Sequence, residues 1–145
     1  MTAPVFVDTN VLVYAVDLAD PHKQRAAQSW LKELWKNKLG RLSFQVLQEF
    51  YVKVGQKGLS TVDDARAEIR DLLVWKPIAV TGGLLERGWK IQDRYQLSFW
   101  DSLIVAAAKS ASCGFLLTED LQSGQDLDGL TVINPFLHDP GSVIR

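Results

Sequence analysis

The stretch Pro4-Val-Phe-Val-Asp8-Thr-Asn-Val-Leu-Val-Tyr-Ala15 decides the class of fold. Its first four residues are apolar and rich in β-branched side chains, which predicts a short strand buried on both faces of a sheet. Asp8 and the two residues after it are all suitable helix caps, and the apolar run 11–15 predicts a helix packed back on the strand. A buried strand followed at once by a helix is typical of α/β proteins with a parallel sheet.

The rest of the chain continues this alternation of strands and helices. Helices are expected over residues 22–38, 44–54, from 61 onward, over 84–95 and over 98–108. Further strands are expected at 41–43, 76–80, 114–118 and 130–133. The expected fold is therefore α/β, a three-layer sandwich in which helices cover both faces of a central, mostly parallel sheet of about five strands. A length of 145 residues corresponds to one domain, 1–145.

The composition excludes several classes of protein. The formal net charge of −1 argues neither for nor against a nucleic-acid partner. The single cysteine, Cys113, excludes an internal disulfide framework and a cysteine-rich zinc site, and favours a reducing, cytoplasmic setting. We see no signal peptide, and no apolar run approaches the ~18 residues of a membrane helix, so no membrane association is expected.

Charged and aromatic residues are distributed unevenly. Basic side chains crowd the chain before its last third, at Lys32, Lys36, Lys38, Arg41, Lys53, Lys57, Lys76, Arg87, Lys90 and Arg94. Solvated helix faces explain such a pattern without a ligand, whereas in a nucleic-acid-binding protein the same residues would contact phosphate. Five tryptophans could stack RNA bases, but Trp30 and Trp89 fit apolar helix stripes, which favours packing in the core or in an oligomer.

Four acidic residues are candidates for chemistry, and each also has a purely structural explanation. They are Asp8, Glu49, Asp101 and Asp120. Asp8 and Asp101 could cap the helices that they open. Glu49 could form an ion pair with Lys53 four residues later, and Asp120 lies in an expected turn.

Position and burial favour a functional role for these acids. Asp8 ends a strand that should be buried, and Asp101 is flanked by bulky apolar residues such as Trp100. In parallel α/β folds, ligands bind beyond the carboxyl ends of the strands, where Asp8 and Asp120 are both expected. Buried carboxylates are costly unless they are paired or bound to metal, and neighbouring ones raise each other's pKa. A hard divalent cation, Mg²⁺ or Mn²⁺, would relieve that repulsion.

Four motifs, in a fixed order, resemble those of the PIN domain family. They are Val-Phe-Val-Asp8-Thr-Asn-Val-Leu-Val-Tyr-Ala, Ser43-Phe-Gln-Val-Leu-Gln-Glu49-Phe, Leu97-Ser-Phe-Trp-Asp101-Ser-Leu-Ile-Val-Ala-Ala-Ala and Leu116-Leu-Thr-Glu-Asp120-Leu-Gln. The resemblance spans nearly the whole chain and implies a single PIN domain over 1–145. Within that family, a chain of this length without appended domains is similar to the VapC-type toxins of bacterial toxin–antitoxin pairs.

The resemblance implies a Mg²⁺-dependent endoribonuclease that hydrolyses RNA with a metal-activated water. Asp8 and Asp101 would bind the metal directly, and the site would be completed, directly or through water, by Glu49 and Asp120. The hydrogen-bonding residues expected to hold the carboxylates or the substrate are Thr9, Asn10, Ser102 and Thr118. The resemblance also implies inhibition by a VapB-type antitoxin and assembly into a homodimer.

The fourth motif departs from the family pattern, and two alternatives follow from the sequence. Many relatives carry a further acid about three residues beyond the Asp120 position, where this chain has Ser123, and Glu119 is the nearest replacement. One alternative is a PIN-like adaptor that binds RNA or protein without cleaving. The other is a haloacid-dehalogenase-like phosphatase, which is disfavoured because that chemistry needs a second aspartate where this chain has Asn10.

Overall fold

A computed structural model describes residues 2–144, so the outermost residues of the expected domain, Met1 and Arg145, lie outside the described part. The strands are β1 (Val5–Val7), β2 (Gly40–Arg41), β3 (Phe115–Leu117) and β4 (Thr131–Ile133). The α-helices are α1 (Thr9–Ala15), α2 (Pro21–Asn37), α3 (Phe44–Gln56), α4 (Val62–Leu72), α5 (Gly82–Tyr95) and α6 (Phe99–Ser110). There are also two short 3₁₀ turns, η1 (Leu73–Trp75) and η2 (Pro140–Ser142).

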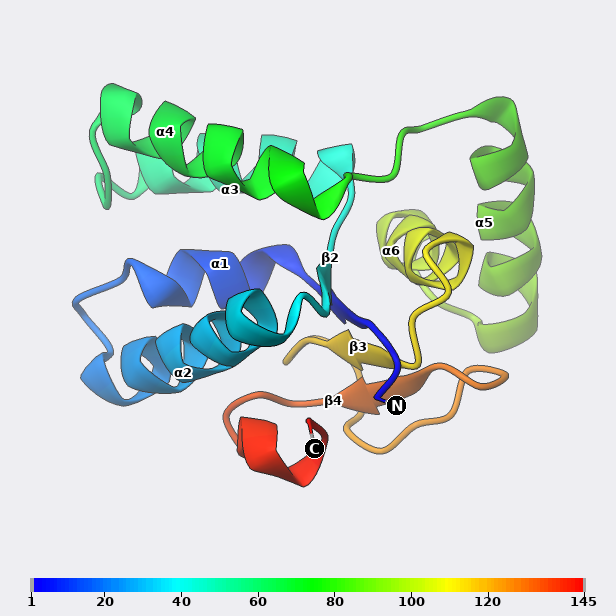
Figure 1. Cartoon of the computed structure of the whole chain (residues 1–145). Helices are drawn as coiled ribbons and strands as arrows, with labels where there is room; N and C mark the ends of the chain where they lie inside the picture. Colours follow the sequence, from blue (N-terminus) through cyan, green and yellow to red (C-terminus); the bar gives the residue numbers. More distant parts are fainter. Residues whose placement is uncertain (1, 145) are drawn as a thin grey trace.

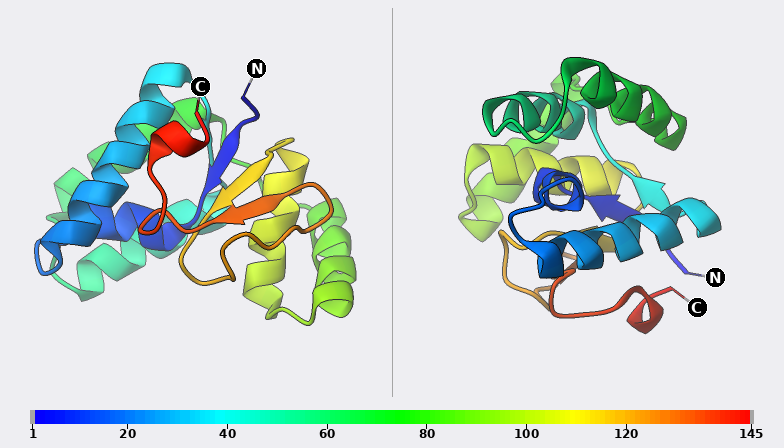
Figure 2. Two further views of the ribbon diagram at one scale, coloured as in Figure 1. Left: turned by 90° about the horizontal axis from the view of Figure 1, so that it is seen from below. Right: turned by 90° about the vertical axis from the view of Figure 1, so that its left-hand side faces the viewer.

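The sheet is parallel throughout, in the order β2-β1-β3-β4 (Figure 1). All three residues of β1 are fully buried, which explains why an apolar run without alternation forms this strand. Helices cover both faces: α1 and α2 lie on one side and α5 and α6 on the other, while α3 and α4 stack above α1 (Figures 1 and 2). The expected α/β three-layer architecture is confirmed.

The expected number of strands was wrong by one. Residues 76–80 do not form a strand, and within the described part of the chain the sheet has four strands rather than five. Only Ile78 pairs with the sheet, through a single parallel bridge to Ser43 beyond the end of β2. Lys76 has a left-handed backbone (φ 54°), and Pro77 has no N–H to donate, so the pairing cannot extend toward the N-terminal side.

Side-chain caps fix where the helices begin. Ser43, Thr61, Thr81 and Ser98 each accept a hydrogen bond from the backbone N–H three residues later, and Asp8 accepts one from Thr9 N. Each such cap satisfies a backbone donor that the helix itself cannot. Three of the capped helices, α1, α3 and α6, carry the candidate acids or begin beside them, so local capping also sets the position of the site.

One of the two tryptophans expected to pack is a core residue. Trp30 of α2 is fully buried, and its indole Nε1–H donates to the carbonyls of Pro135 and His138. Trp89 is about half exposed, so it does not belong to the core. No helix among residues 2–144 has the length and apolarity needed to cross a bilayer.

Candidate active site

The four candidate acids lie in four separate parts of the chain. Asp8 lies between β1 and α1, and Asp120 follows β3 by three residues. Because β1 and β3 are neighbouring parallel strands, their carboxyl ends meet at one edge of the sheet. Glu49 is in the middle of α3, and Asp101 is in the first turn of α6. The negative charges of Glu49 and Asp120 raise the pKa of both other acids, so the four carboxylates share one electrostatic site.

Asp8 is the buried centre of this cluster. It is only 7% exposed. Its Oδ1 accepts a hydrogen bond from Thr9 N at 2.7 Å, and its Oδ2 accepts one from the Thr118 hydroxyl at 2.8 Å. The capping role considered from the sequence is therefore real, but it occupies only one of the two oxygens. The other oxygen is held by a residue 110 positions away, which fixes the direction of the carboxylate.

Burial raises the pKa of Asp8 from 3.8 to about 6. Desolvation is the largest cause, because removal from water disfavours the charged form. The hydrogen bonds from Thr118 and Thr9 oppose it, while the nearby charges of Asp120 and Glu49 add to it. An ionised Asp8 is thus destabilising in this setting unless a positive charge lies beside it.

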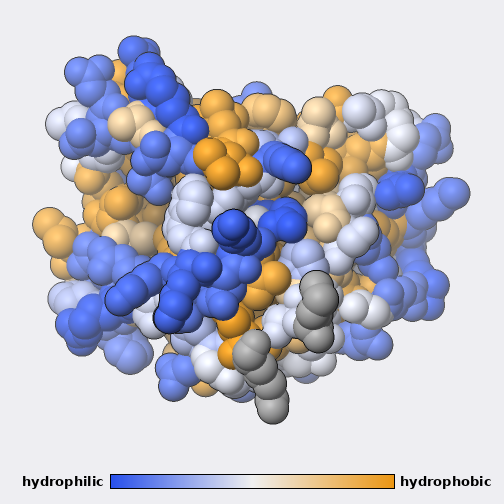
Figure 3. All heavy atoms as spheres, viewed as in Figure 1, coloured by the Kyte–Doolittle hydropathy of each residue, from blue (hydrophilic) through white to orange (hydrophobic). Residues whose placement is uncertain are grey.

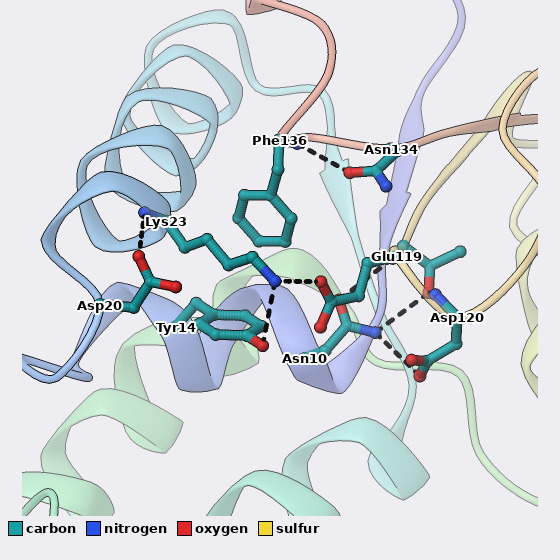
Figure 4. Close-up of polar contacts among 9 residues, drawn as sticks. Asn10, Tyr14, Asp20, Lys23, Glu119, Asp120, Asn134 and Phe136 are labelled. Atoms are coloured by element: carbon teal, nitrogen blue, oxygen red, sulfur yellow. Dashed lines mark hydrogen bonds and ion pairs between the residues drawn. The ribbon is translucent and has the colours of Figure 1, made fainter.

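Asn10 and Thr118 connect Asp8 to Asp120. The amide nitrogen of Asn10 donates to Thr118 Oγ1 at 3.0 Å and to Asp120 Oδ2 at 3.1 Å (Figure 4). Thr118 is fully buried and also accepts a hydrogen bond from Asp120 N at 3.1 Å. The two residues therefore orient both carboxylates without neutralising either. Asp120 itself is exposed to solvent.

Glu49 is held by two donors from different helices. Thr9 Oγ1 donates to its Oε2 at 3.2 Å, and Gln45 Nε2 donates to its Oε1 at 2.8 Å. The sequence spacing offered Lys53 as an alternative partner for Glu49, but no such ion pair forms among the described residues. Gln45 was missed at the sequence level. Its signal is its position one turn before Glu49, which places the two polar side chains on the same side of α3, and Gln45 is buried there.

Asp101 is less buried than its apolar neighbours suggest. It is partly exposed, because Trp100 points outward and is 64% exposed. Partial desolvation still raises the pKa of Asp101, with further contributions from Asp120 and Glu49, while a hydrogen bond with Ser98 lowers it. Ser102 is fully buried, and its hydroxyl donates to the Ser98 carbonyl at 2.7 Å. Among residues 2–144, Ser102 thus supports the first turn of α6 and makes no hydrogen bond to a candidate carboxylate.

Glu119 and Ser123 have structural partners. The Glu119 carboxylate forms an ion pair with Lys23 Nζ at 2.8 Å, while the lysine also donates to the Tyr14 hydroxyl at 3.3 Å (Figure 4). Its ammonium group lies over the rings of Tyr14 and Phe136. Ser123 Oγ accepts a hydrogen bond from Asn134 N. Glu119 is thereby turned toward α2, and nothing in the sequence signals its pairing with a residue 96 positions away.

Among residues 2–144, no basic side chain forms an ion pair with the four candidate carboxylates. The two ion pairs in this part of the chain join Lys23 to Glu119 and Arg94 to Asp128. The candidate ligands are carboxylate oxygens, which suit a hard cation such as Mg²⁺. Within the same residues, no three acidic, histidine or cysteine side chains already form a close ligand set. The absence of such a close set is compatible with Mg²⁺, because this ion keeps several of its waters when it binds to proteins.

The sequence matches the family model of the PIN domain over residues 5–123. The matched span contains all four candidate acids and both strands that position Asp8 and Asp120. Among curated proteins, none is similar enough in sequence to count as a match.

Several solved structures share the fold. A toxin–antitoxin complex from Klebsiella pneumoniae superposes with a TM-score of 0.59 at 18% identity, covering 90% of this chain and 97% of the other. VapC20 of Mycobacterium tuberculosis, a toxin that cleaves the sarcin–ricin loop, gives 0.59 at 24% identity, with 77% and 86% covered. VapBC2 from Rickettsia felis, bound to a DNA fragment from its promoter, gives 0.59 at 16% identity, with 88% and 96% covered. At these identities the likeness extends to the fold alone.

Proposed function

The chain belongs to the PIN domain family, and from that premise we propose that it is a Mg²⁺-dependent endoribonuclease, a toxin of the VapC type. One observation carries the proposal. Four carboxylates converge at the carboxyl end of a parallel sheet, where ligands of such folds bind, and within the described residues none of them is paired with a cation. A site of this charge repels phosphate unless a metal ion is bound.

Asp8 and Asp101 would hold Mg²⁺, or Mn²⁺ in its place, through their own oxygens, and Glu49 and Asp120 would do so directly or through bound water. When bound, such an ion lowers the pKa of a coordinated water and stabilises negative charge on the attacking and leaving oxygens. The buried Asp8 is the natural anchor, because a cation removes the cost of its ionised form.

The remaining polar residues set the geometry. Thr118 and Asn10 fix the directions of Asp8 and Asp120, and Thr9 fixes that of Glu49. Preorganised side chains of this kind avoid the cost of reorientation when substrate binds. Gln45 adds a second support for Glu49 from within α3. None of these residues needs to change protonation, so their contribution is positional.

A toxin nuclease requires a partner that silences it, and we include a VapB-type antitoxin in the proposal. An apolar groove of about 320 Å³ runs between α3 and α4, lined by Phe44, Leu47, Gln48, Tyr51, Val52 and Ile69. Phe44 and Val52 are exposed there, which is typical of a surface that a protein partner covers. The same type of surface would serve a homodimer, the assembly that the resemblance implies.

The function is tested by incubating purified protein with total RNA in Mg²⁺ and, in parallel, in EDTA. We expect discrete RNA fragments with Mg²⁺ and intact RNA with EDTA, since the carboxylates cannot approach phosphate without the ion. A VapB-type antitoxin that binds the protein should stop cleavage. Fragments formed equally in EDTA would contradict the metal-dependent mechanism. RNA that is bound but never cut would favour the adaptor alternative instead.

A further inference from the structure

A second concave site lies away from the carboxylates. A cavity of about 520 Å³ is lined by two tryptophans, three basic residues and one valine: Trp35, Lys38, Arg41, Val74, Trp75 and Lys76. These residues come from the end of α2, from β2 and from η1 with the residue after it. They belong to the stretches 35–41 and 74–76, which precede the Ser43–Ile78 bridge, whereas the candidate acids follow β1 and β3 or lie on α3 and α6.

Two tryptophans form one wall of the cavity, of which Trp35 is exposed and Trp75 is buried. The rings of Trp35 and Trp75 meet at a centroid distance of 4.9 Å and an angle of 48°. Trp75 is 5% exposed and packs on Gly40, where an added Cβ would lie 2.4 Å from its ring. Trp35 is 38% exposed. The buried indole therefore fixes the pair, and the outer indole offers a flat face for stacking.

The polar wall of the cavity is cationic. Lys38, Arg41 and Lys76 line it, and none of the acidic residues that the structure describes does. Neither of the two ion pairs among residues 2–144 involves any of the three. The Arg41 guanidinium is anchored through Nη1 to the carbonyls of Lys38 and Gly40, at 3.2 and 2.8 Å. Both lysines adopt a left-handed backbone, with φ of 58° and 54°, a conformation in which glycine is the usual residue.

An aromatic face beside a cluster of positive charges has the chemistry that recognises a nucleotide. Bases stack on tryptophan, and a phosphate is matched by guanidinium and ammonium groups. The volume falls within the ~300–1,000 Å³ usual for small-ligand pockets. The chain as a whole carries a net charge of −1, so a local cluster of three positive charges is not a consequence of overall composition.

We propose that this cavity, the Trp35–Trp75 site, anchors one nucleotide of a single-stranded RNA at a distance from the carboxylates. The base stacks on Trp35, and the adjoining phosphate contacts Lys38, Arg41 and Lys76. Figure 3 shows hydrophilic side chains gathered in the middle of this face, over β2 and the end of α2, beside hydrophobic ones over the end of α4. The choice of RNA as the ligand rests on the proposed ribonuclease function.

The test measures RNA binding in EDTA, so that neither cleavage nor the metal contributes. Trp35→Ala and the double variant Lys38→Gln/Lys76→Gln should each weaken binding of a fluorescein-labelled single-stranded oligoribonucleotide by about tenfold, measured by anisotropy. The lysine variant should also reduce the slope of log Kd against log salt concentration by about 1 to 2. Arg25→Gln/Arg70→Gln, which removes two positive charges at exposed positions outside the cavity, should leave both values unchanged.

The outcomes separate this proposal from the proposed function. Equal RNA affinity in the cavity variants and in the control would overturn the Trp35–Trp75 site, even if the wild-type protein cleaves RNA. Loss of binding in the cavity variants of a protein that cuts no RNA would keep the site and reject the nuclease. Adenosine monophosphate that binds as tightly as the oligonucleotide would identify a free nucleotide as the occupant, and would overturn the assignment to RNA. If Trp35→Ala fails to fold, the RNA affinity of Lys38→Gln/Lys76→Gln, which changes only exposed side chains, still tests the Trp35–Trp75 site.

Discussion

Replacement of Asp8 by asparagine should raise the free energy of unfolding of the metal-free protein, relative to wild type, by about 3 kcal/mol more at neutral pH than at a pH of about 4. The buried carboxyl has a pKa of about 6, against 3.8 for an ordinary aspartate. The folded state therefore binds this proton more tightly than the unfolded state does. Wild-type stability consequently falls as the pH rises from about 4 through 6, and it stays lower above that range.

The Asp8→Asn variant removes the charge and keeps the cap on Thr9 N, but its amide nitrogen cannot accept the Thr118 hydroxyl that Asp8 Oδ2 accepts. The variant does not titrate at this position, so the change in its stability relative to wild type with pH isolates the charge of Asp8. An asparagine oxygen can accept from Thr9 N, and asparagine is as good a helix cap as aspartate. Urea unfolding in EDTA at neutral pH and at a pH of about 4 measures the effect. We expect the stability of the variant relative to wild type to be higher at neutral pH than in acid. Asp93→Asn, at an exposed position on α5, controls for loss of one negative charge. A stability difference between variant and wild type that is the same at both pH values would contradict the burial of an unpaired charge at Asp8.

Replacement of Asp101 by asparagine should lower the rate of RNA cleavage in Mg²⁺ by at least about a thousandfold. Asp101 is held in the first turn of α6 by the Ser98 cap, so the amide should preserve the helix and lose only the anionic ligand. The comparison with Thr118→Val is informative, because Thr118 would act only by orienting Asp8 and Asp120. Loss of such an orienting partner costs ~10–100-fold in metal sites.

The cleavage rates of wild type, Asp101→Asn, Thr118→Val and Asp93→Asn are compared on one labelled RNA under single-turnover conditions. The ranking expected is Asp93→Asn equal to wild type, Thr118→Val intermediate and Asp101→Asn slowest. Cleavage by Asp101→Asn at the wild-type rate would contradict a role for Asp101 in the metal site.

Much of this arrangement can be predicted from sequence, because the signals are local. The apolar run before Asp8 predicts β1, and the caps at Ser43 and Ser98 predict where α3 and α6 begin; the structure confirms all three elements. The placement of Asp8 and Asp120 at one edge also follows from general behaviour of parallel sheets. The three elements depend on residues within one turn or one strand of each other, and the meeting of the two acids depends on the common direction of β1 and β3.

Features that depend on distant residues could not be predicted in the same way. The segment 76–80 has the composition of a strand, yet a left-handed Lys76 and the missing N–H of Pro77 reduce it to one bridge at Ile78. The exposure of Trp100 leaves Asp101 only partly buried. The Lys23–Glu119 pair joins helix α2 to the loop after β3. Pro77 is a local signal against a strand at 76–80, whereas the other two results depend on three-dimensional packing, about which the sequence pattern carries no information.

Binding of a divalent ion by the carboxylates is measured most directly by titrating the protein with Mn²⁺ and following the electron paramagnetic resonance signal of the free ion. Wild-type protein should suppress that signal until its sites are filled, and excess Mg²⁺ should restore it. Asp8→Asn and Asp101→Asn should leave the signal as it is in buffer, while Asp93→Asn should behave as wild type. A wild-type protein that takes up no Mn²⁺, or Asp8→Asn and Asp101→Asn variants that take up as much as wild type, would contradict a metal site built on Asp8, Glu49, Asp101 and Asp120.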